Sequence, residues 1–182
     1  MKIYLMSLKI ENKTKIAVFG SAFNPPSLGH KSVIDSLSHF DKVILVPSIS
    51  HAWGKEMLDY ELRCKLVELF VKDLNSKKIE ISKVEKDLYQ PEQSVTTFAV
   101  LSALEKHYAN AELTFIIGPD NFISFDKFVR YKEILTRWSV TVCPEKLNIR
   151  STFIRDNLRN KKSVEKLTTF SVEKYLLENN VY

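Results

Sequence analysis

The sequence lacks several features that would assign it to other classes of protein. Among its 182 residues, no apolar run approaches the ~18 residues that a membrane-spanning helix needs. The opening segment, MKIYLMSLKIENK, has neither a sustained apolar stretch nor a small-residue cleavage site, so we expect no signal peptide. Lysine and arginine are scattered rather than gathered in a stripe, which argues against nucleic-acid binding. We therefore expect a cytoplasmic protein that binds neither membranes nor nucleic acids.

Cysteine is also scarce. Only Cys64 and Cys143 occur, and their spacing matches no metal site, so we expect two buried free thiols in a reducing cytoplasm. Apolar residues make up 45% of the chain and charged residues 27%, proportions typical of a globular protein. The net charge of +5 suits an anionic ligand, although many soluble proteins carry a similar charge. The length favours one domain, which we assign to residues 15–182, and residues 1–14 are expected to form an N-terminal arm or an extra edge strand.

The stretch from residue 15 to residue 36, KIAVFGSAFNPPSLGHKSVIDS, predicts a strand, a tight loop and a helix. The start of a helix in such a unit presents unpaired backbone N–H groups and the positive end of its dipole, which favour a phosphate. No Gly-Lys-Ser/Thr follows, so the loop is not a Walker loop, and the third glycine of a dinucleotide fingerprint is missing. His30 stands at the helix start instead, where its imidazole can donate a hydrogen bond or carry a charge.

Strand-like and helix-like segments alternate along the rest of the chain. The predicted strands cover residues 43–47, 78–82, 113–117 and 138–143. Helices are predicted at residues 58–74, 94–108 and from 151 onward, and loops at residues 48–57 and from 83 through 91. This alternation favours an α/β fold, a doubly wound (Rossmann-like) parallel sheet with helices on both faces. Ligands bind such sheets at the carboxyl ends of the strands, where the loops near Gly20 and Gly118 and the helix start at Ser151 are expected to meet.

Three motifs resemble those of one enzyme family. Gly20–His30, GSAFNPPSLGH, resembles the G-G-T-F-D-P-x-H-x-G-H signature of nucleotidyltransferases, specifically of the nicotinate/nicotinamide mononucleotide adenylyltransferases. Phe115–Tyr131, FIIGPDNFISFDKFVRY, is similar to the family's F-I-I-G-x-D-x-L-x-x-F-x-x-W-x-x-Y. Ile149–Arg155, IRSTFIR, is close to I-S-S-T-x-I-R. The motifs follow one another in the family's order, so the resemblance covers nearly the whole chain after Lys15.

The resemblance implies an adenylyltransferase of NAD biosynthesis. In that reaction a pyridine mononucleotide attacks the α-phosphate of ATP and displaces pyrophosphate, and Mg²⁺ is held through the ATP phosphates and water. Whether the acceptor is nicotinate or nicotinamide mononucleotide stays open, as does the formation of a homo-oligomer. Two alternatives are a transferase of the same fold that uses another acceptor, and a degenerate module that binds a nucleotide without turnover.

Specific roles also follow from the resemblance. It implies that the catalytic residues are His30, Ser27 and Arg155. It implies that ATP is bound by Gly20, Ser21, Phe23, Gly29, His30, Lys55, Gly118, Asp120, Ser151, Thr152 and Arg155. It implies that the acceptor is bound by Ala22, Phe23, His51, Thr96 and Phe128. No residue is assigned as a metal ligand.

The first motif departs from the family's pattern at three positions. Ser27 replaces the first histidine of H-x-G-H, and Ala22 and Asn24 replace threonine and aspartate. Ser27 keeps two interpretations, a hydroxyl that bonds phosphate or the N-cap of the helix that begins near Leu28. These departures favour the degenerate module, whereas the intact His30 favours turnover.

The third motif repeats the pattern of a helix start. Ser151 and Thr152 are expected to cap the helix and to bond phosphate, and Arg155 is expected to bind phosphate oxygens with its planar guanidinium. Arg150, where the family's motif has serine, is expected to be exposed to solvent. The alternative is an ordinary cap followed by a solvated arginine.

Other assignments leave two interpretations open. Asp120 is expected to bond a ribose hydroxyl or to cap a helix, and Phe128 to stack on a pyridine ring or to pack in the core. His51, Lys55 and Arg63 resemble the basic group that meets the ATP phosphates in the family. The alternative for these three is a solvated surface.

Overall fold

Five parallel strands form one sheet in the described part of the chain. The computed structural model describes residues 13–50 and 57–182. The strands are β1 (Thr14–Ser21), β2 (Lys42–Pro47), β3 (Ile79–Ile81), β4 (Ala111–Ile117) and β5 (Ser139–Val142). Their spatial order is β3-β2-β1-β4-β5, and each neighbouring pair is parallel. The predicted doubly wound parallel sheet is therefore confirmed.

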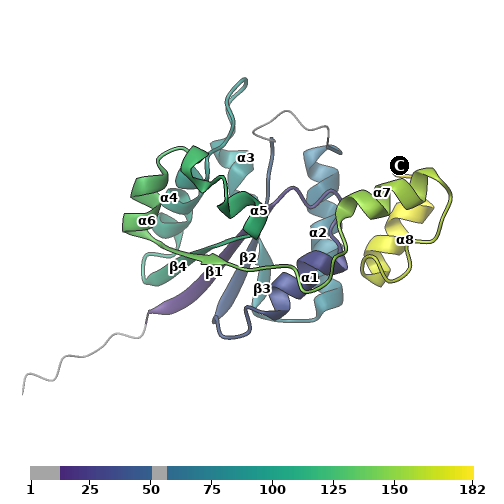
Figure 1. Cartoon of the computed structure of the whole chain (residues 1–182), viewed down its shortest axis with the longest axis horizontal. Helices are drawn as coiled ribbons and strands as arrows, with labels where there is room; N and C mark the ends of the chain where they lie inside the picture. The colour runs from purple at the N-terminus through teal and green to yellow at the C-terminus, as the bar shows by residue number, and fades with distance from the viewer. Residues whose placement is uncertain (1–12, 51–56) are drawn as a thin grey trace, which may run out of the picture.

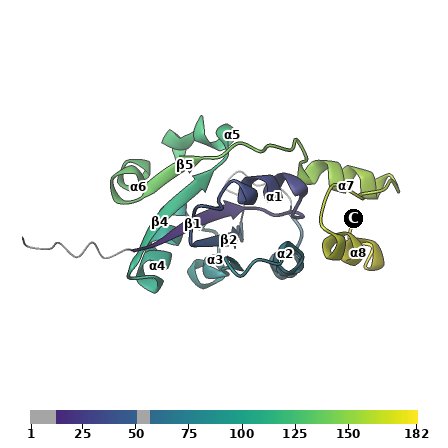
Figure 2. The same cartoon turned by 90° about the horizontal axis from the view of Figure 1, so that it is seen from below.

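Helices cover both faces of this sheet, which lies between them in Figure 1. They are α1 (Leu28–Asp35), α2 (Tyr60–Leu74), α3 (Val84–Leu88), α4 (Thr97–His107), α5 (Pro119–Phe122), the 3₁₀ turn η1 (Phe125–Lys127), α6 (Tyr131–Arg137), α7 (Ser151–Arg159) and α8 (Phe170–Glu178). One core cluster joins α1, α2, α7 and α8 to the sheet, and a second joins α3, α4, η1 and α6 to its other face. Figure 2 shows α7 and α8 beyond α1 and α2, away from β4 and β5.

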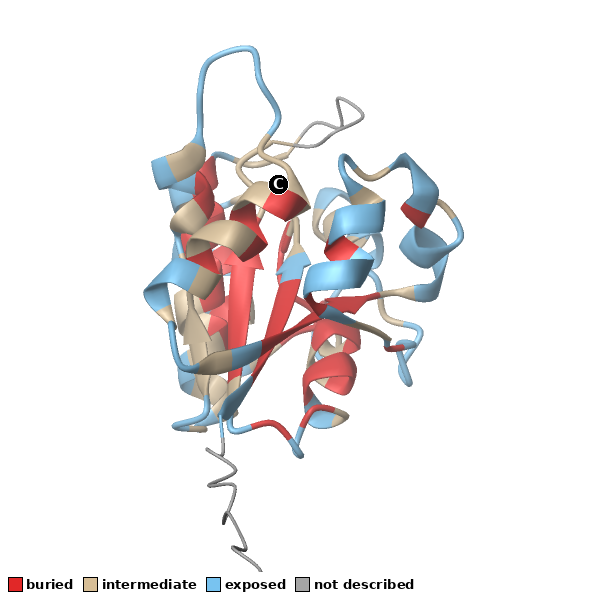
Figure 3. Ribbon diagram, turned by 90° about the vertical axis from the view of Figure 1, so that its left-hand side faces the viewer, coloured by how far each residue is buried: buried red, intermediate tan, exposed pale blue. Residues whose placement is uncertain are grey.

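Alternate residues of the central strand β1 enter the two core clusters. Ala17 and Phe19 pack towards α1 and α2, whereas Ile16 and Val18 pack towards α4. A parallel strand with helices on both faces is buried on both, which explains why its sequence is a continuous apolar run. Figure 3 shows the middle of the sheet buried, where β1, β2 and β4 each carry a run of buried residues, whereas β3 and β5 at the edges carry none.

The strand order creates a switch point beside β1. From β1 the chain builds β2 and β3 on one side, and it then returns to add β4 and β5 on the other. The loops that follow β1 and β4 therefore lead away in opposite directions. In open α/β sheets, ligands bind at this point, outside the carboxyl ends of the strands.

Most predicted elements exist, with bounds shifted by a few residues. The helix predicted from residue 58 begins at Tyr60, because the Asp59 side chain caps it by accepting from two backbone N–H groups. The helix predicted from residue 94 begins at Thr97, with Thr96 as its cap. β1 begins at Thr14, the last residue of the predicted arm, and residues 1–12 lie outside the described part of the chain.

The prediction of a loop from residue 83 through residue 91 is wrong, because α3 occupies Val84–Leu88. Five residues make little more than one turn, which is too short to show a helical period in the sequence. Glu85 and Asp87 lie in its first turn, where negative side chains suit the helix dipole. This helix matters for function, because Glu85 reaches the cavity described below.

Both cysteines, Cys64 and Cys143, are free and buried, as predicted. Cys64 lies on α2 and Cys143 directly follows β5. Within residues 13–50 and 57–182, no helix combines the length and the apolar character needed to cross a membrane.

Candidate active site

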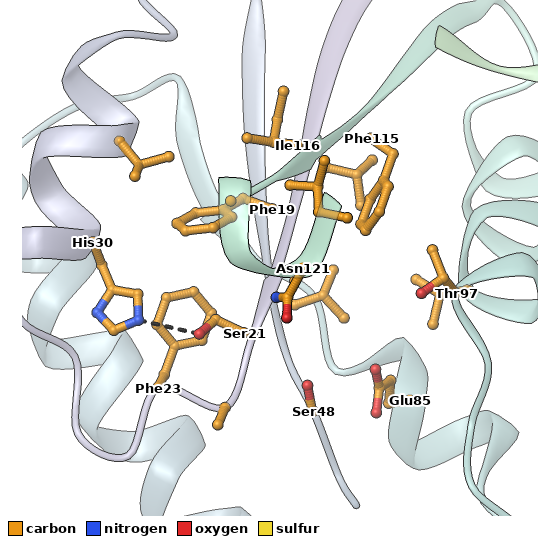
Figure 4. Close-up of a pocket in the computed structure, with 18 of the residues that line it drawn as sticks. Phe19, Ser21, Phe23, His30, Ser48, Glu85, Thr97, Phe115, Ile116 and Asn121 are labelled. Carbon is orange, nitrogen blue, oxygen red and sulfur yellow. Dashed lines mark hydrogen bonds between the residues drawn. The ribbon is translucent and has the colours of Figure 1, made fainter. Parts of the chain in front are cut away.

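A cavity of about 580 Å³ opens at the carboxyl ends of β1, β2 and β4. This volume lies in the range of small-molecule sites. Its walls come from the loops after β1 and β4, the start of α4 and the start of α7, which are far apart in the sequence. Figure 4 shows His30 on one side of the cavity, Thr97 on the other and Asn121 between them.

Most predicted site residues that the structure describes meet at this cavity. They are Gly20, Ser21, Ala22, Phe23, His30, Thr96, Gly118, Phe128, Ser151, Thr152 and Arg155. Ser27, Gly29 and Asp120 are not among its lining residues. His51 and Lys55 lie outside the described residues.

Ser27 is fully buried and caps α1. Its Oγ accepts the backbone N–H of His30 at 3.4 Å, and its own backbone N–H donates to Nδ1 of His30 at 3.1 Å. The same Oγ donates to the carbonyl oxygen of Ile149 at 3.0 Å. Because the side chain has 0% exposure and lies outside the cavity lining, the structure supports the cap and not the phosphate contact.

His30 is neutral and presents a donor to the cavity. Burial lowers the pKa of His30 to about 4, and the rings of Phe19 and Phe23 lie 6.1 Å and 4.8 Å from its imidazole, centroid to centroid. Nδ1 faces the backbone N–H of Ser27 at 3.1 Å and also lies 2.9 Å from Oγ of Ser27. We assign the ring proton to Nε2, because Nδ1 must then accept from the backbone N–H. Nε2 lies 3.1 Å from Oγ of Ser21, as Figure 4 shows. Of the two states that the sequence allowed, the structure favours the uncharged donor.

Position 29 requires glycine because of a close backbone contact, which the sequence did not reveal. A Cβ atom at this position would lie 2.2 Å from the carbonyl oxygen of Ile149, a clash with backbone that cannot move aside cheaply. Glycine therefore allows the segment before α7 to approach the start of α1. Together with the bond from Ser27 to Ile149, this contact fixes the first and third motifs against each other.

The first turn of α7 contacts the loop after β1. The N-cap of α7 is Arg150, and its side chain makes no capping bond, so the predicted capping by Ser151 and Thr152 is wrong. The hydroxyl of Ser151 instead donates to the carbonyl oxygen of Pro25 at 2.7 Å. Arg155 donates from Nη1 to the carbonyl oxygen of Asn24 at 2.8 Å and from Nη2 to Oγ1 of Thr152 at 3.1 Å.

Arg63 is a buried structural residue. Its side chain is 1% exposed, and its Nη1 donates to the carbonyl oxygens of Ala22 at 2.8 Å and Ser48 at 2.6 Å. Its Nε donates to the carbonyl oxygen of Leu58 at 2.9 Å. Arg63 does not line the cavity, so both sequence-based interpretations, a phosphate ligand and a solvated side chain, are wrong for it.

Two of the residues predicted to bind the acceptor, Thr96 before α4 and Phe128 after η1, line the cavity. Thr96 caps α4 by accepting the backbone N–H of Ala99 at 3.2 Å, and it also lines the cavity. Phe128 lines the cavity and packs against Phe125 and Phe115, with ring centroids 5.0 Å and 6.3 Å away. Phe128 therefore packs as a core aromatic and also lines the cavity, and its stacking on a pyridine ring stays a prediction.

Comparisons with known proteins agree with this geometry. The model of the cytidylyltransferase-like family matches residues 18–169. The chain belongs to this family of nucleotidyltransferases. A solved structure of a putative nicotinate-nucleotide adenylyltransferase from Vibrio parahaemolyticus is 53% identical, with a TM-score of 0.82 over 90% of this chain and 99% of that one. A probable nicotinate-nucleotide adenylyltransferase of Flavobacterium psychrophilum is 30% identical over 92% of this chain and 98% of its own length.

A more distant structure shows the same fold. It is the Plasmodium falciparum nicotinic acid mononucleotide adenylyltransferase complexed with NaAD, which is 17% identical, with a TM-score of 0.71 over 93% of this chain and 97% of that one. The resemblance read from the three sequence motifs is thus confirmed, and the chain is a nucleotidyltransferase on the nicotinate-nucleotide adenylyltransferase branch.

Some residues of this nucleotidyltransferase cavity escaped sequence analysis. Asn121 and Arg150 both line it, although Arg150 was expected only to be exposed. Arg150 pairs with Asp120 at 3.1 Å. Asp120 is not among the lining residues, and it does not cap α5, whose N-cap is Gly118. A bond from Asp120 to a ribose hydroxyl stays a prediction. Asn121 directly follows the predicted aspartate, so a polar run after β4 was the available signal.

Glu85 is another lining residue that the sequence did not indicate. It is 8% exposed and accepts the backbone N–H of Ile49 at 2.7 Å. Burial raises the pKa of Glu85 to about 7, although the bond from Ile49 and the charge of Arg63 act in the other direction. Figure 4 shows Glu85 on the side of the cavity opposite His30.

Proposed function

We propose that this nucleotidyltransferase joins ATP to the phosphate of a pyridine mononucleotide at the cavity and releases pyrophosphate. The observation that supports the proposal is a pair of hydrogen-bond donors that line the cavity beside the loop after β1, Nε2–H of His30 and the guanidinium of Arg155. Arg155 has five N–H groups, and within the described residues its bonds to Asn24 and Thr152 use two of them. The other three are free to bind phosphate oxygens.

The chemistry needs positioning more than a reactive side chain. An oxygen of the acceptor phosphate attacks the α-phosphorus of ATP in line, and the bond from that phosphorus to the oxygen bridging to the β-phosphate breaks. Pyrophosphate departs with the electron pair. The attacking phosphate is already ionised, so no general base is required. His30 and Arg155 donate hydrogen bonds to the oxygens on which negative charge increases, as preorganised donors do in phosphoryl transfer.

Magnesium fits this site as an ion carried by ATP. No group of three histidine, cysteine, aspartate or glutamate side chains in the described residues could hold a metal ion. The carboxylates among the lining residues are Glu85 and Glu145. Mg²⁺ commonly keeps several waters and binds through substrate phosphates with few protein ligands, and it supplies charge neutralisation when bound.

The acceptor is proposed to lie between Phe128 and Thr96. An aromatic face and a hydroxyl suit a pyridine ring and its polar substituent, and relatives named nicotinate-nucleotide adenylyltransferase support nicotinate mononucleotide in particular. The two buried free thiols support a reducing compartment, so we propose that the reaction takes place in the cytoplasm.

Pyrophosphate release tests this function. The protein is incubated with ATP, Mg²⁺ and one acceptor at a time, from nicotinate mononucleotide, nicotinamide mononucleotide, phosphopantetheine and a sugar phosphate. We expect turnover with a pyridine mononucleotide and little with the others. Turnover with phosphopantetheine or the sugar phosphate alone would show a transferase with another acceptor. ATP binding with no release from any acceptor would leave a nucleotide-binding module.

A further inference from the structure

Asn24 joins four separate segments of the chain at the edge of the cavity. It lies in the loop after β1 and is 4% exposed. Its side-chain Oδ1 accepts the backbone N–H of Leu58 at 3.2 Å and the hydroxyl of Tyr182 at 3.1 Å. Its backbone oxygen accepts Nη1 of Arg155 at 2.8 Å. Asn24 therefore bonds both to Arg155, through its backbone oxygen, and to Tyr182, through its side chain.

The way α8 ends explains how Tyr182 reaches this loop. Asn180 adopts a left-handed conformation with φ of 47°, which asparagine tolerates better than most residues. The backbone N–H of Asn180 bonds to Leu177 at 3.4 Å, and that of Val181 bonds back to Leu176 at 3.2 Å. These two bonds form a Schellman motif, in which the residue after the turn packs on the last helical turn. Val181 packs accordingly against the core that contains Leu176, and the chain turns towards Asn24.

The hydroxyl of Tyr182 keeps its proton and so acts as the donor. Burial raises the pKa of Tyr182, and the nearby charges of Arg155, Arg159 and Arg63 lower it by a smaller amount. The hydroxyl is therefore protonated at every pH at which the enzyme is expected to work. Its proton bonds to Asn24, and Arg155 is near enough for its positive charge to lower the pKa of this hydroxyl.

We propose that Tyr182 is a positioning residue of the transferase site, whose hydroxyl fixes Asn24 so that Asn24 holds Arg155 facing the cavity. This inference rests on the proposed function, because Arg155 is taken to bind the ATP phosphates. Tyr182 itself does not line the cavity. Without its hydroxyl, Oδ1 of Asn24 keeps only the N–H of Leu58 in the described structure, so Asn24 is held less firmly against Arg155.

A purely structural role for Tyr182 makes different predictions. Loss of packing would lower the melting temperature and reduce the amount of active enzyme, which affects both substrates alike. A positioning role acts through Arg155 and therefore on ATP alone. The two roles are separated by the Michaelis constants for the two substrates and by coupling to a substitution at Arg155.

The variant Tyr182→Phe removes the hydroxyl and keeps the ring, and Tyr175→Phe is its matched control. Tyr175 lies on α8 and packs on the same core, but its hydroxyl has no hydrogen-bond partner in the part of the chain that the structure describes. For each variant we would measure the melting temperature, calorimetric binding of ATP with Mg²⁺, and pyrophosphate release over a range of each substrate. The double variant Tyr182→Phe with Arg155→Lys measures the coupling.

We expect Tyr182→Phe to lower kcat/KM for ATP about 3- to 10-fold, the effect of one neutral hydrogen bond, with the acceptor KM unchanged and a melting temperature close to that of Tyr175→Phe. In the double variant the two losses should be less than multiplicative, because both act through one arginine. Rates within twofold of the parent, equal effects on both substrates, or fully multiplicative losses would each overturn the proposal. If the parent binds ATP but releases no pyrophosphate, the proposed function fails, and the same coupling measured on ATP affinity still decides the role of Tyr182.

Discussion

Ser27 and His30 hold each other through reciprocal hydrogen bonds at the start of α1. The backbone N–H of Ser27 donates to Nδ1 of His30 at 3.1 Å, and the backbone N–H of His30 donates to Oγ of Ser27 at 3.4 Å. In an ordinary capping box the third helical residue is glutamate or glutamine, and here an imidazole takes that part. The consequence is chemical as well as structural, since the arrangement leaves Nε2–H as the donor towards the cavity.

Substitution of Ser27 should therefore act mainly on stability. Ser27→Ala removes the cap of α1 and a donor to Ile149, so we expect the free energy of unfolding to fall by about 1–2 kcal/mol. Turnover should fall modestly, because the backbone N–H that orients His30 remains. The measurement is urea unfolding beside pyrophosphate release, with Ser38→Ala as an exposed control. A stable variant with a large loss of rate would mean that Ser27 touches the phosphates.

Restoring the family's histidine at position 27 should not raise activity. Ser27 is fully buried and its hydroxyl donates to Ile149, so an imidazole there would have to displace this bond and the atoms packed around it. We expect Ser27→His to lower the melting temperature by more than Ser27→Ala does, as overpacked substitutions do. A variant that melts no earlier and turns over faster than the parent would contradict the buried placement of Ser27.

Substitution of His30 should act mainly on the rate. Removing a well-aimed donor to a developing anion typically costs about 10²–10³ in kcat, so His30→Ala should lose activity on that scale. ATP affinity should change far less, because the bond strengthens in the transition state. His30→Gln offers a neutral N–H donor and should recover part of the rate. We would measure ATP binding by calorimetry and the rate of pyrophosphate release for these variants, with His39→Ala as a surface control. A loss of ATP affinity without a loss of rate would contradict the assignment of His30.

The buried imidazole also predicts a pH dependence of stability. The pKa of His30 is about 4 in the folded protein and about 6.5 when unfolded, so the unfolded chain binds the proton first as the pH falls. The contribution of His30 to stability should therefore decrease between pH 6.5 and pH 4, by up to about 3 kcal/mol, and should not change above pH 6.5. Urea unfolding of the parent and of His30→Gln at several pH values checks this. Parallel pH profiles for the two proteins would exclude His30 as the cause.

Glu85 should change stability with pH in the direction opposite to that of His30. Its pKa is about 7 in the folded protein against 4.5 as the reference value, so the folded state binds the proton more tightly. Stability from this group is present below pH 4.5 and is lost as the pH rises through 7. Glu85→Gln should remove this loss, so the stability of the variant relative to the parent should increase as the pH rises from 4.5 to 7. An unchanged slope between pH 4.5 and pH 7 would place the carboxyl in water.

Two glycines at the site should respond differently to alanine. A Cβ atom at Gly29 would meet the carbonyl oxygen of Ile149 at 2.2 Å, whereas one at Gly118 would meet nothing within 4 Å. We expect Gly29→Ala to cost about 1–3 kcal/mol or more in unfolding free energy and Gly118→Ala to leave stability almost unchanged. Thermal melting of both variants tests the packing of the first motif against the third. Equal melting temperatures would contradict it.

The fold could be predicted from the sequence because each strand and most helices have a recognisable pattern of apolar residues within their own segment. Continuous apolar runs such as that of β1 indicate strands covered on both faces, and their alternation with helices indicates a parallel sheet. The meeting of the first and third motifs followed from topology alone. The division into an arm and one domain at residue 15 stays a prediction, and so do the roles of His51 and Lys55.

The roles of some side chains could not be predicted from the sequence, because they depend on contacts between remote segments. Arg63 is buried because carbonyl oxygens of Ala22, Ser48 and Leu58 surround it, and no pattern near residue 63 reveals that. The hydroxyl of Ser151 is taken by Pro25 rather than by its own helix for the same reason. Sequence motifs identified which segments meet, and the structure showed which atoms face the cavity.

Transfer of a labelled phosphate tests the central claim most directly. The protein is incubated with Mg²⁺, nicotinate mononucleotide and ATP that carries a radioactive α-phosphate, and the products are separated by chromatography. Attack on the α-phosphorus predicts that the label moves into a dinucleotide, that unlabelled pyrophosphate appears in equal amount, and that His30→Ala reduces both together. Label that remains in ATP while ATP binds, or that appears in AMP without any dinucleotide, would contradict adenylyl transfer.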